Sequence, residues 1–80
     1  MRELLIEKWI EPSLISEKGD MYWLNKYGEL HSFNDSPAAI FATEYKGWYK
    51  NGQLHRDGNK PSMIWSNGDK WWYKNGEFIK

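Results

Sequence analysis

Apolar and polar residues alternate at short range along most of the chain, in runs too short for helices of ordinary length. The run Trp71-Trp72-Tyr73 shows the pattern, because on a pleated strand Trp71 and Tyr73 point to one face and Trp72 points to the other. Such runs end at glycine or proline residues, which favour turns and interrupt helices. The pattern therefore predicts short β-strands joined by tight turns.

The first nine residues fit two interpretations. Leu4, Leu5 and Lys8 are compatible with a helix as well as with a strand. We predict a strand, because Glu3-Leu4 is in register with Glu29-Leu30 and Gln53-Leu54 of the later strands.

The strands and turns belong to an internal repeat. The string WYKNG occurs at 48–52 and again at 72–76, and its glycines lie 24 positions apart. The same spacing separates three further pairs, His31 and His55, Pro37 and Pro61, and Ile40 and Ile64. One unit reads P-x-x-I, a turn, a strand with tryptophan, N-G or Y-G, and x-L-H. Such a period is typical of architectures in which each unit is too small to hide its own apolar face and stacked units hide it together.

The turns indicate how each unit folds. Asn51-Gly52 and Asn75-Gly76 suit type I′ hairpin turns, which need a positive φ at both central residues. Lys18-Gly19-Asp20 and Asn67-Gly68-Asp69 form the other turn of the unit, which degenerates to Thr43-Glu44 in the middle copy. We predict an all-β fold, an antiparallel β-meander of about three degenerate 24-residue hairpin repeats. A single domain spans residues 1–80, with units at 1–11 (partial), 12–36, 37–60 and 61–80.

The two faces of this sheet carry different aromatic sets. Three tryptophans each lie eight residues beyond the isoleucine of their unit, and we predict that they form the core column: Trp23, Trp48 and Trp72. The opposite face carries Tyr49, Trp65, Trp71 and Tyr73. These rings are either covered by another subunit or offered to a ligand.

Composition limits the alternatives. The chain has 80 residues, no cysteine, and 6 Trp, 5 Tyr and 3 Phe, so large rings rather than disulfides must supply the core. The absence of cysteine favours a cytoplasmic location. Eleven basic and 11 acidic side chains give a formal charge of zero, which argues against bulk binding of nucleic acid or of an anionic membrane. The N-terminal stretch is too short for a signal peptide or a membrane helix.

The repeat resembles a known family. The motif W-Y-x-N-G-x-L-H-R-D-x-x-x-P-x-x-I, seen best at 48–64 and more weakly at 22–40 with Ser32 in the arginine's place, is similar to the MORN-like repeats of tailed-phage and giant-virus proteins. Lys60 departs from the small residue usual before the proline. The resemblance implies an antiparallel β-meander that serves as a binding or scaffolding surface. It also implies a small phage protein that acts as an interaction module in the bacterial host cytoplasm.

Catalytic and metal-binding signatures are weak. His55-Arg56-Asp57 matches the start of a kinase catalytic loop by chance, because the chain has no room for a nucleotide-binding lobe. His31 and His55 occupy equivalent repeat positions without a second ligand at metal-site spacing. Acid and base pairs could form from Asp57, Asp69 and Glu77, although turn carboxylates usually solvate hairpins. We expect no enzyme activity, no metal and no cofactor.

Three function classes follow. The first is a non-enzymatic binding protein that inhibits or sequesters a host component, either a defence protein or its nucleotide messenger. The second is a structural module that forms homo-oligomers through open sheet edges, and the third is a small hydrolase. For the first class, rings beside Arg56, Lys60 and Lys70 would make a stacking and charge platform for a base, a nucleotide or a peptide. The predicted binding residues are Tyr49, His55, Arg56, Asp57, Trp65, Lys70, Trp71 and Tyr73, with the loop at 55–60 as the alternative site.

Overall fold

The computed structural model describes residues 11–80, and within them every regular element is a β-strand. The predicted all-β class is therefore confirmed, whereas the strand predicted in residues 1–9 lies outside the described residues. The strands are β1 (Leu14–Ile15), β2 (Met21–Tyr22), β3 (Ala39–Ile40), β4 (Lys46–Gly47), β5 (Tyr49–Lys50), β6 (Gln53–Leu54), β7 (Met63–Ile64), β8 (Lys70–Trp71), β9 (Tyr73–Lys74) and β10 (Glu77–Phe78).

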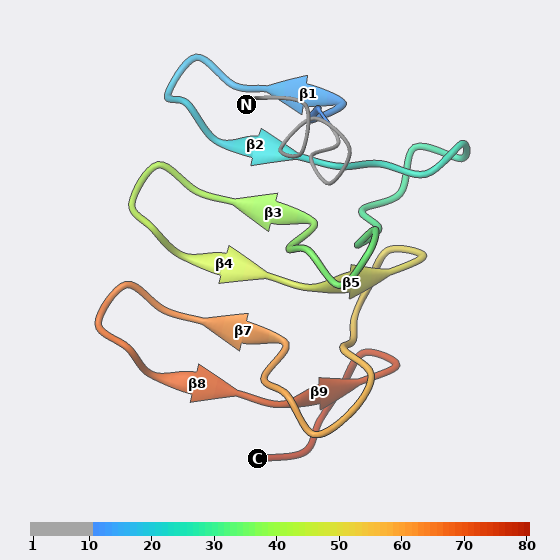
Figure 1. Ribbon diagram of the computed structural model, residues 1–80, viewed down its shortest axis with the longest axis vertical. Helices are drawn as coiled ribbons and strands as arrows, with labels where there is room; N and C mark the ends of the chain where they lie inside the picture. Colours follow the sequence, from blue (N-terminus) through green and yellow to red (C-terminus); the bar gives the residue numbers. More distant parts are fainter. Residues whose placement is uncertain (1–10) are drawn as a thin grey trace, which may run out of the picture.

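The main sheet is antiparallel and has the order β1-β2-β3-β4-β7-β8. Two further hairpins, β5–β6 and β9–β10, stand outside this order, so β4 pairs with β7 rather than with β5. Three hairpins lie one above another, with their closing turns along one side of the molecule (Figure 1). The extra hairpins and the long connecting loops lie along the other side, which gives the molecule a sheet side and a loop side.

The Asn-Gly turns have the predicted geometry. Asn51 and Gly52 have φ angles of 50° and 85°, and Asn75 and Gly76 have 52° and 84°. Both central residues of each two-residue loop are thus left-handed, as a type I′ turn requires. The Tyr27-Gly28 copy is different, because only the glycine has a positive φ.

The first turn of each unit has one shape in all three copies. The loops 16–20, 41–45 and 65–69 are each closed by a 2.9 Å hydrogen bond from the amide of the first residue to the carbonyl of the last. The left-handed position holds Gly19 or Gly68 in the outer copies, both with φ 95°. In the middle copy Glu44 adopts φ 69°, so the turn degenerates in sequence but keeps its shape.

The tryptophan column forms one part of the core. Trp23 and Trp48 are buried at 5% exposure, together with Ala38, Ala39 and Met63. Trp72 is only half-buried, because it follows β8, the last strand in the order of the described sheet. The predicted column therefore holds for two of its three tryptophans.

The opposite face carries a continuous line of rings, here called the aromatic strip. Tyr45 stacks between Phe41 and Trp65, with ring centroids 4.5 and 4.4 Å apart, and Trp65 meets Trp71 edge-on at 5.2 Å. Gly47 leaves space for the neighbouring Tyr49 ring, since a Cβ at this position would lie only 2.9 Å from it. The members of the strip are Tyr22, Phe41, Tyr45, Trp65, Trp71, Tyr73 and Phe78.

The Leu-His pair of one unit holds the Asn-Gly turn of the next. His55 Nδ1 accepts a hydrogen bond from the Asn75 amide at 3.0 Å, and the Leu54 carbonyl accepts one from the Gly76 amide at 2.9 Å. His31 and Leu30 receive the Asn51 and Gly52 amides in the same way, at 3.1 and 2.8 Å. The histidines of the repeat are thus explained by docking between units.

Candidate functional site

Two hollows lie on the loop side, one on each side of residues 56–60. The first hollow has a volume of about 380 Å³, and the second has about 260 Å³. They share Arg56, Asp57, Gly58 and Lys60 as a common wall. The first hollow is also lined by His31, Ser32, Asp35, Trp48, Tyr49, Lys50 and His55, and the second by Asn59, Trp72, Tyr73, Lys74, Ile79 and Lys80.

Arg56 holds the wall between the hollows in place. Its guanidinium lies 3.9 Å from the centre of the Trp48 ring, in cation–π geometry. The same group donates to both carboxylate oxygens of Asp35, at 3.0 and 3.3 Å, and to the Pro61 carbonyl at 3.1 Å. With a side chain only 14% exposed, Arg56 is chiefly a structural residue of the loop.

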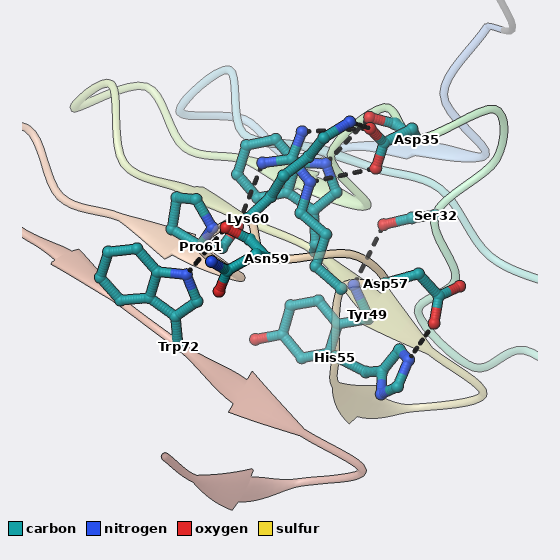
Figure 2. A network of polar contacts seen from close by, with 11 residues as sticks. Ser32, Asp35, Tyr49, His55, Asp57, Asn59, Lys60, Pro61 and Trp72 are labelled. Atoms are coloured by element: carbon teal, nitrogen blue, oxygen red, sulfur yellow. Dashed lines mark hydrogen bonds and ion pairs between the residues drawn. The ribbon is translucent and has the colours of Figure 1, made fainter. Parts of the chain in front are cut away.

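Asp35 is the acidic centre of this cluster. Besides Arg56, it receives the Lys60 ammonium at 2.9 Å, as Figure 2 shows. Hydrogen bonds from Arg56 and Lys60 lower the pKa of the Asp35 carboxyl from its usual 3.8 to about 2. The backbone carbonyl of Asp35 also accepts a hydrogen bond from Trp48 Nε1 at 3.0 Å, so this loop ties one unit to the next.

His55 and Asp57 form a second polar pair, away from Asp35 (Figure 2). His55 Nε2 lies 2.8 Å from Asp57 Oδ1, and this bond lowers the pKa of the Asp57 carboxyl. Because Nδ1 already accepts from the Asn75 amide, Nε2 carries the proton and donates it to Asp57. His55 is 6% exposed, and both of its ring nitrogens are engaged.

Two lysines complete the hollows. Lys50 lines the first hollow and Lys74 lines the second, at equivalent positions of the two WYKNG strings. Both side chains are exposed, and neither makes an ion pair with a described residue. Their charges contribute to the low pKa of Asp57, which places that carboxylate within the electrostatic reach of both.

The predicted site residues are divided between the two sides of the molecule. Tyr49, His55, Arg56 and Asp57 line the first hollow, and Tyr73, which also belongs to the aromatic strip, lines the second. Trp65 and Trp71 belong to the aromatic strip and line neither hollow. Lys70 is exposed and pairs with Ile64, in the row that faces away from the strip. The predicted platform of Trp71 beside Arg56 and Lys70 is therefore not one surface.

Ring faces at the centre of the aromatic strip and on two tryptophans of the loop side are occupied. Within the strip, Tyr45 and Trp65 are stacked at 4.4 Å and nearly parallel, which leaves no space for a base between them. On the loop side, Arg56 covers the Trp48 ring, and the Lys80 ammonium lies 4.9 Å from the centre of the Trp72 ring. The structure thus favours recognition by charge and shape over recognition by stacking.

Asp35, Lys50 and Lys74 were not among the predicted site residues. The spacing of 24 between the two lysines is visible in the sequence and could have drawn attention to them. Asp35 gave no such signal, because the equivalent position in the next unit is Asn59, which has no carboxylate. Asn59 contacts Trp72 through its backbone carbonyl, 3.5 Å from Trp72 Nε1.

Comparison of the chain with protein-family models, with curated proteins and with solved structures finds no match. The described residues contain no helix long and apolar enough to cross a membrane. Nor do these residues gather three or more His, Cys, Asp or Glu side chains that could hold a metal ion.

Proposed function

We propose that this protein is a small non-enzymatic binding module whose binding surface is the loop side, over the two hollows. The observation that carries the proposal is the wall at 56–60, which is fixed by Arg56 and has an indented, aromatic and cationic surface on each side. Ligand sites are typically concave surfaces that combine apolar walls with a few placed polar groups.

The geometry of His55 supports a binding role over a hydrolase. A general base needs a free ring nitrogen within reach of a nucleophile. In His55 one nitrogen accepts from Asn75 and the other donates to Asp57. The pair that most resembles catalytic machinery therefore stabilises the fold.

The resemblance to MORN-like repeats of phage proteins supports a more specific proposal about the partner. On that basis the module acts in the bacterial host cytoplasm, where it binds and inhibits or sequesters a host defence component.

Self-association is the second candidate function. Strand β1 is the first strand in the order of the described sheet, and its Leu14 and Ile15 are 55% and 61% exposed. Apolar residues on an open edge strand favour pairing with another chain. Size-exclusion chromatography with light scattering would show such pairing as a concentration-dependent mass, and Leu14→Lys would reduce it.

A pull-down from bacterial lysate tests the binding proposal. In the variant Asn59→Trp, an indole is added at the second hollow without a change of charge, and the backbone carbonyl that accepts from Trp72 is kept. Ser66→Trp adds the same side chain to an exposed turn of the sheet side and serves as the matched control.

We expect the wild type and Ser66→Trp to retain the same partner, identified by native mass spectrometry, and Asn59→Trp to lose it. Circular dichroism melts establish that both variants fold. If Asn59→Trp retains the partner as well as the wild type does, the binding surface lies elsewhere and the proposal is wrong.

A further inference from the structure

We infer that the two hollows bind an acidic, extended segment of a partner protein, with Lys50 and Lys74 each receiving one of its carboxylates. This inference rests on the binding function proposed above and deepens it by naming the chemistry of the partner.

The charges that line the hollows are the first argument. Asp35 is already paired with Arg56 and Lys60, and Asp57 is held by His55. Lys50 and Lys74 add two ammonium groups that no described residue pairs. The surface around the wall at 56–60 therefore carries an excess of positive charge, although the whole chain is formally neutral.

The spacing of the two lysines is the second argument. Lys50 ends β5 and Lys74 ends β9. These two strands follow β4 and β8 along the chain, and β4 and β8 are separated in the main sheet by β7 alone. Two strand separations amount to about 10 Å, and we infer a similar interval between the two lysines from the stacking of their units. Alternate side chains of an extended peptide point to one side, so carboxylates two or four residues apart are separated by about 7 or 13 Å, and the long lysine stems can reach either pair. A single phosphate is too small to reach both.

The occupied ring faces are the third argument, and they disfavour a nucleotide. A base would need an exposed aromatic face, but Arg56 covers Trp48 and Lys80 covers Trp72. An acidic peptide needs no such face, because its carboxylates are recognised by charge. Tyr49 and Tyr73 line the two hollows and provide apolar area for the stems of acidic side chains.

Fluorescence anisotropy with defined probes tests this inference. The probes are a fluorescein-labelled peptide of eight glutamates and a matched peptide of eight glutamines, and unlabelled ATP is the competitor. The double variant Lys50→Glu/Lys74→Glu reverses both charges at the hollows. Lys46→Glu/Lys70→Glu changes the net charge equally on exposed strand residues that line neither hollow.

We expect the glutamate peptide to bind the wild-type chain, the glutamine peptide not to bind, and binding to weaken with added salt. Lys50→Glu/Lys74→Glu should weaken binding about tenfold or more, as the loss of two ion pairs predicts, and the control should change it less than about threefold. Equal losses in both double variants would mean attraction by net charge alone, and would overturn the inference.

Two other results would also overturn it. If ATP displaces the labelled peptide at a far lower concentration than unlabelled glutamate peptide does, the ligand is a nucleotide. A glutamate peptide that does not bind, while Asn59→Trp still loses the lysate partner, would leave the binding proposal intact and exclude an acidic segment. If the glutamate peptide does not bind and Asn59→Trp also retains the lysate partner, the binding function itself is wrong.

Discussion

At the scale of single residues, Glu44 is the position where this sequence departs most from the local preference of its backbone. Its φ of 69° lies in the left-handed region, which costs an ordinary side chain about 1 kcal/mol or more. The equivalent residues Gly19 and Gly68 are free of that cost. Stacking on the neighbouring hairpins holds the middle turn in the common shape despite the missing glycine.

Replacement of Glu44 by glycine should therefore stabilise the protein. We expect Glu44→Gly to raise the free energy of unfolding by about 0.5 to 1 kcal/mol, because relief of the strain exceeds the added entropy of the unfolded chain. Urea denaturation measures the effect. Thr43→Gly, in the same turn but at a residue without positive φ, is the control and should lower stability by a similar amount. A loss in both variants would contradict the strain at Glu44.

Asp35 makes stability depend on acid pH. Its folded-state pKa of about 2 lies below the usual 3.8, so its contribution is fully present above pH 3.8 and is lost as the pH falls towards 2. Because the carboxyl is 46% exposed, solvent screening limits this contribution to about 1 kcal/mol or less. Urea midpoints measured from pH 5 to pH 2 should fall more steeply for the wild type than for Asp35→Asn, since asparagine tolerates the φ of 61° but does not titrate. Parallel curves would show that the Asp35 ion pairs contribute nothing.

At the scale of elements, the Leu-His pair is the contact by which one hairpin positions the next. The repeat predicted that His31 and His55 are equivalent, but it gave no reason for a histidine. The structure supplies one: a neutral imidazole offers an acceptor at Nδ1 to the Asn amide of the next unit's turn.

Removal of that acceptor should loosen one turn and leave its equivalent in place. We expect His55→Leu to lower stability by about 1 to 3 kcal/mol, because the buried ring makes two hydrogen bonds and each typically contributes about 0.5 to 1.5 kcal/mol. In hydrogen exchange, the Asn75 amide should lose protection while the Asn51 amide, held by His31, keeps it. Asp57→Asn is the control, because an amide oxygen still accepts from His55 Nε2 and little stability should be lost. Equal loss of protection at Asn51 and Asn75 would mean general unfolding rather than a local docking contact.

Turn types and strand alternation could be predicted from the sequence because they depend on neighbouring residues. The Asn-Gly turns are of this kind, as is the alternation of Lys70 and Trp71 between the two rows of the sheet. Contacts between units could not be predicted, because they depend on how the loops pack. Ser32, which looks like a weak copy of Arg56, accepts from the Tyr49 amide at 3.0 Å. Ser62 accepts from the equivalent Tyr73 amide at 2.7 Å, and Ser32 thus replaces the hydroxyl missing at Ala38.

At the scale of the whole molecule, two-residue strands and a small buried set leave the protein dependent on a few large side chains. The buried hydrophobic residues of the described chain are only Trp23, Ala38, Ala39, Trp48 and Met63. The aromatic strip adds area on the other face, but its ends are open, since Trp71 is 40% exposed and Phe78 is 59% exposed. The two faces therefore stabilise the protein unequally.

Alanine substitutions at Trp48 and Trp71 compare how much the two faces contribute to stability. Trp48 is 5% exposed, donates to the Asp35 carbonyl and lies under Arg56, so Trp48→Ala should cost about 3 to 5 kcal/mol. That is comparable with the whole stability of about 4 to 12 kcal/mol expected for a domain of this length, and the variant should be largely unfolded at 37 °C. Trp71→Ala removes a partly exposed ring with two edge-on contacts and should cost about 1 to 2 kcal/mol.

Thermal melts followed by circular dichroism, with Trp48→Phe as an intermediate, give the comparison. The phenylalanine keeps most of the buried area but loses the bond to the Asp35 carbonyl, so its melting temperature should lie between those of the wild type and Trp48→Ala. Because Trp71 lines neither hollow, Trp71→Ala should also bind the lysate partner as the wild type does. A Trp71→Ala variant that melts as early as Trp48→Ala would make the strip an equal part of the core. A Trp71→Ala variant that folds normally but loses the partner would place the binding surface on the aromatic strip, because the exposed ring is then the only group whose removal explains the loss.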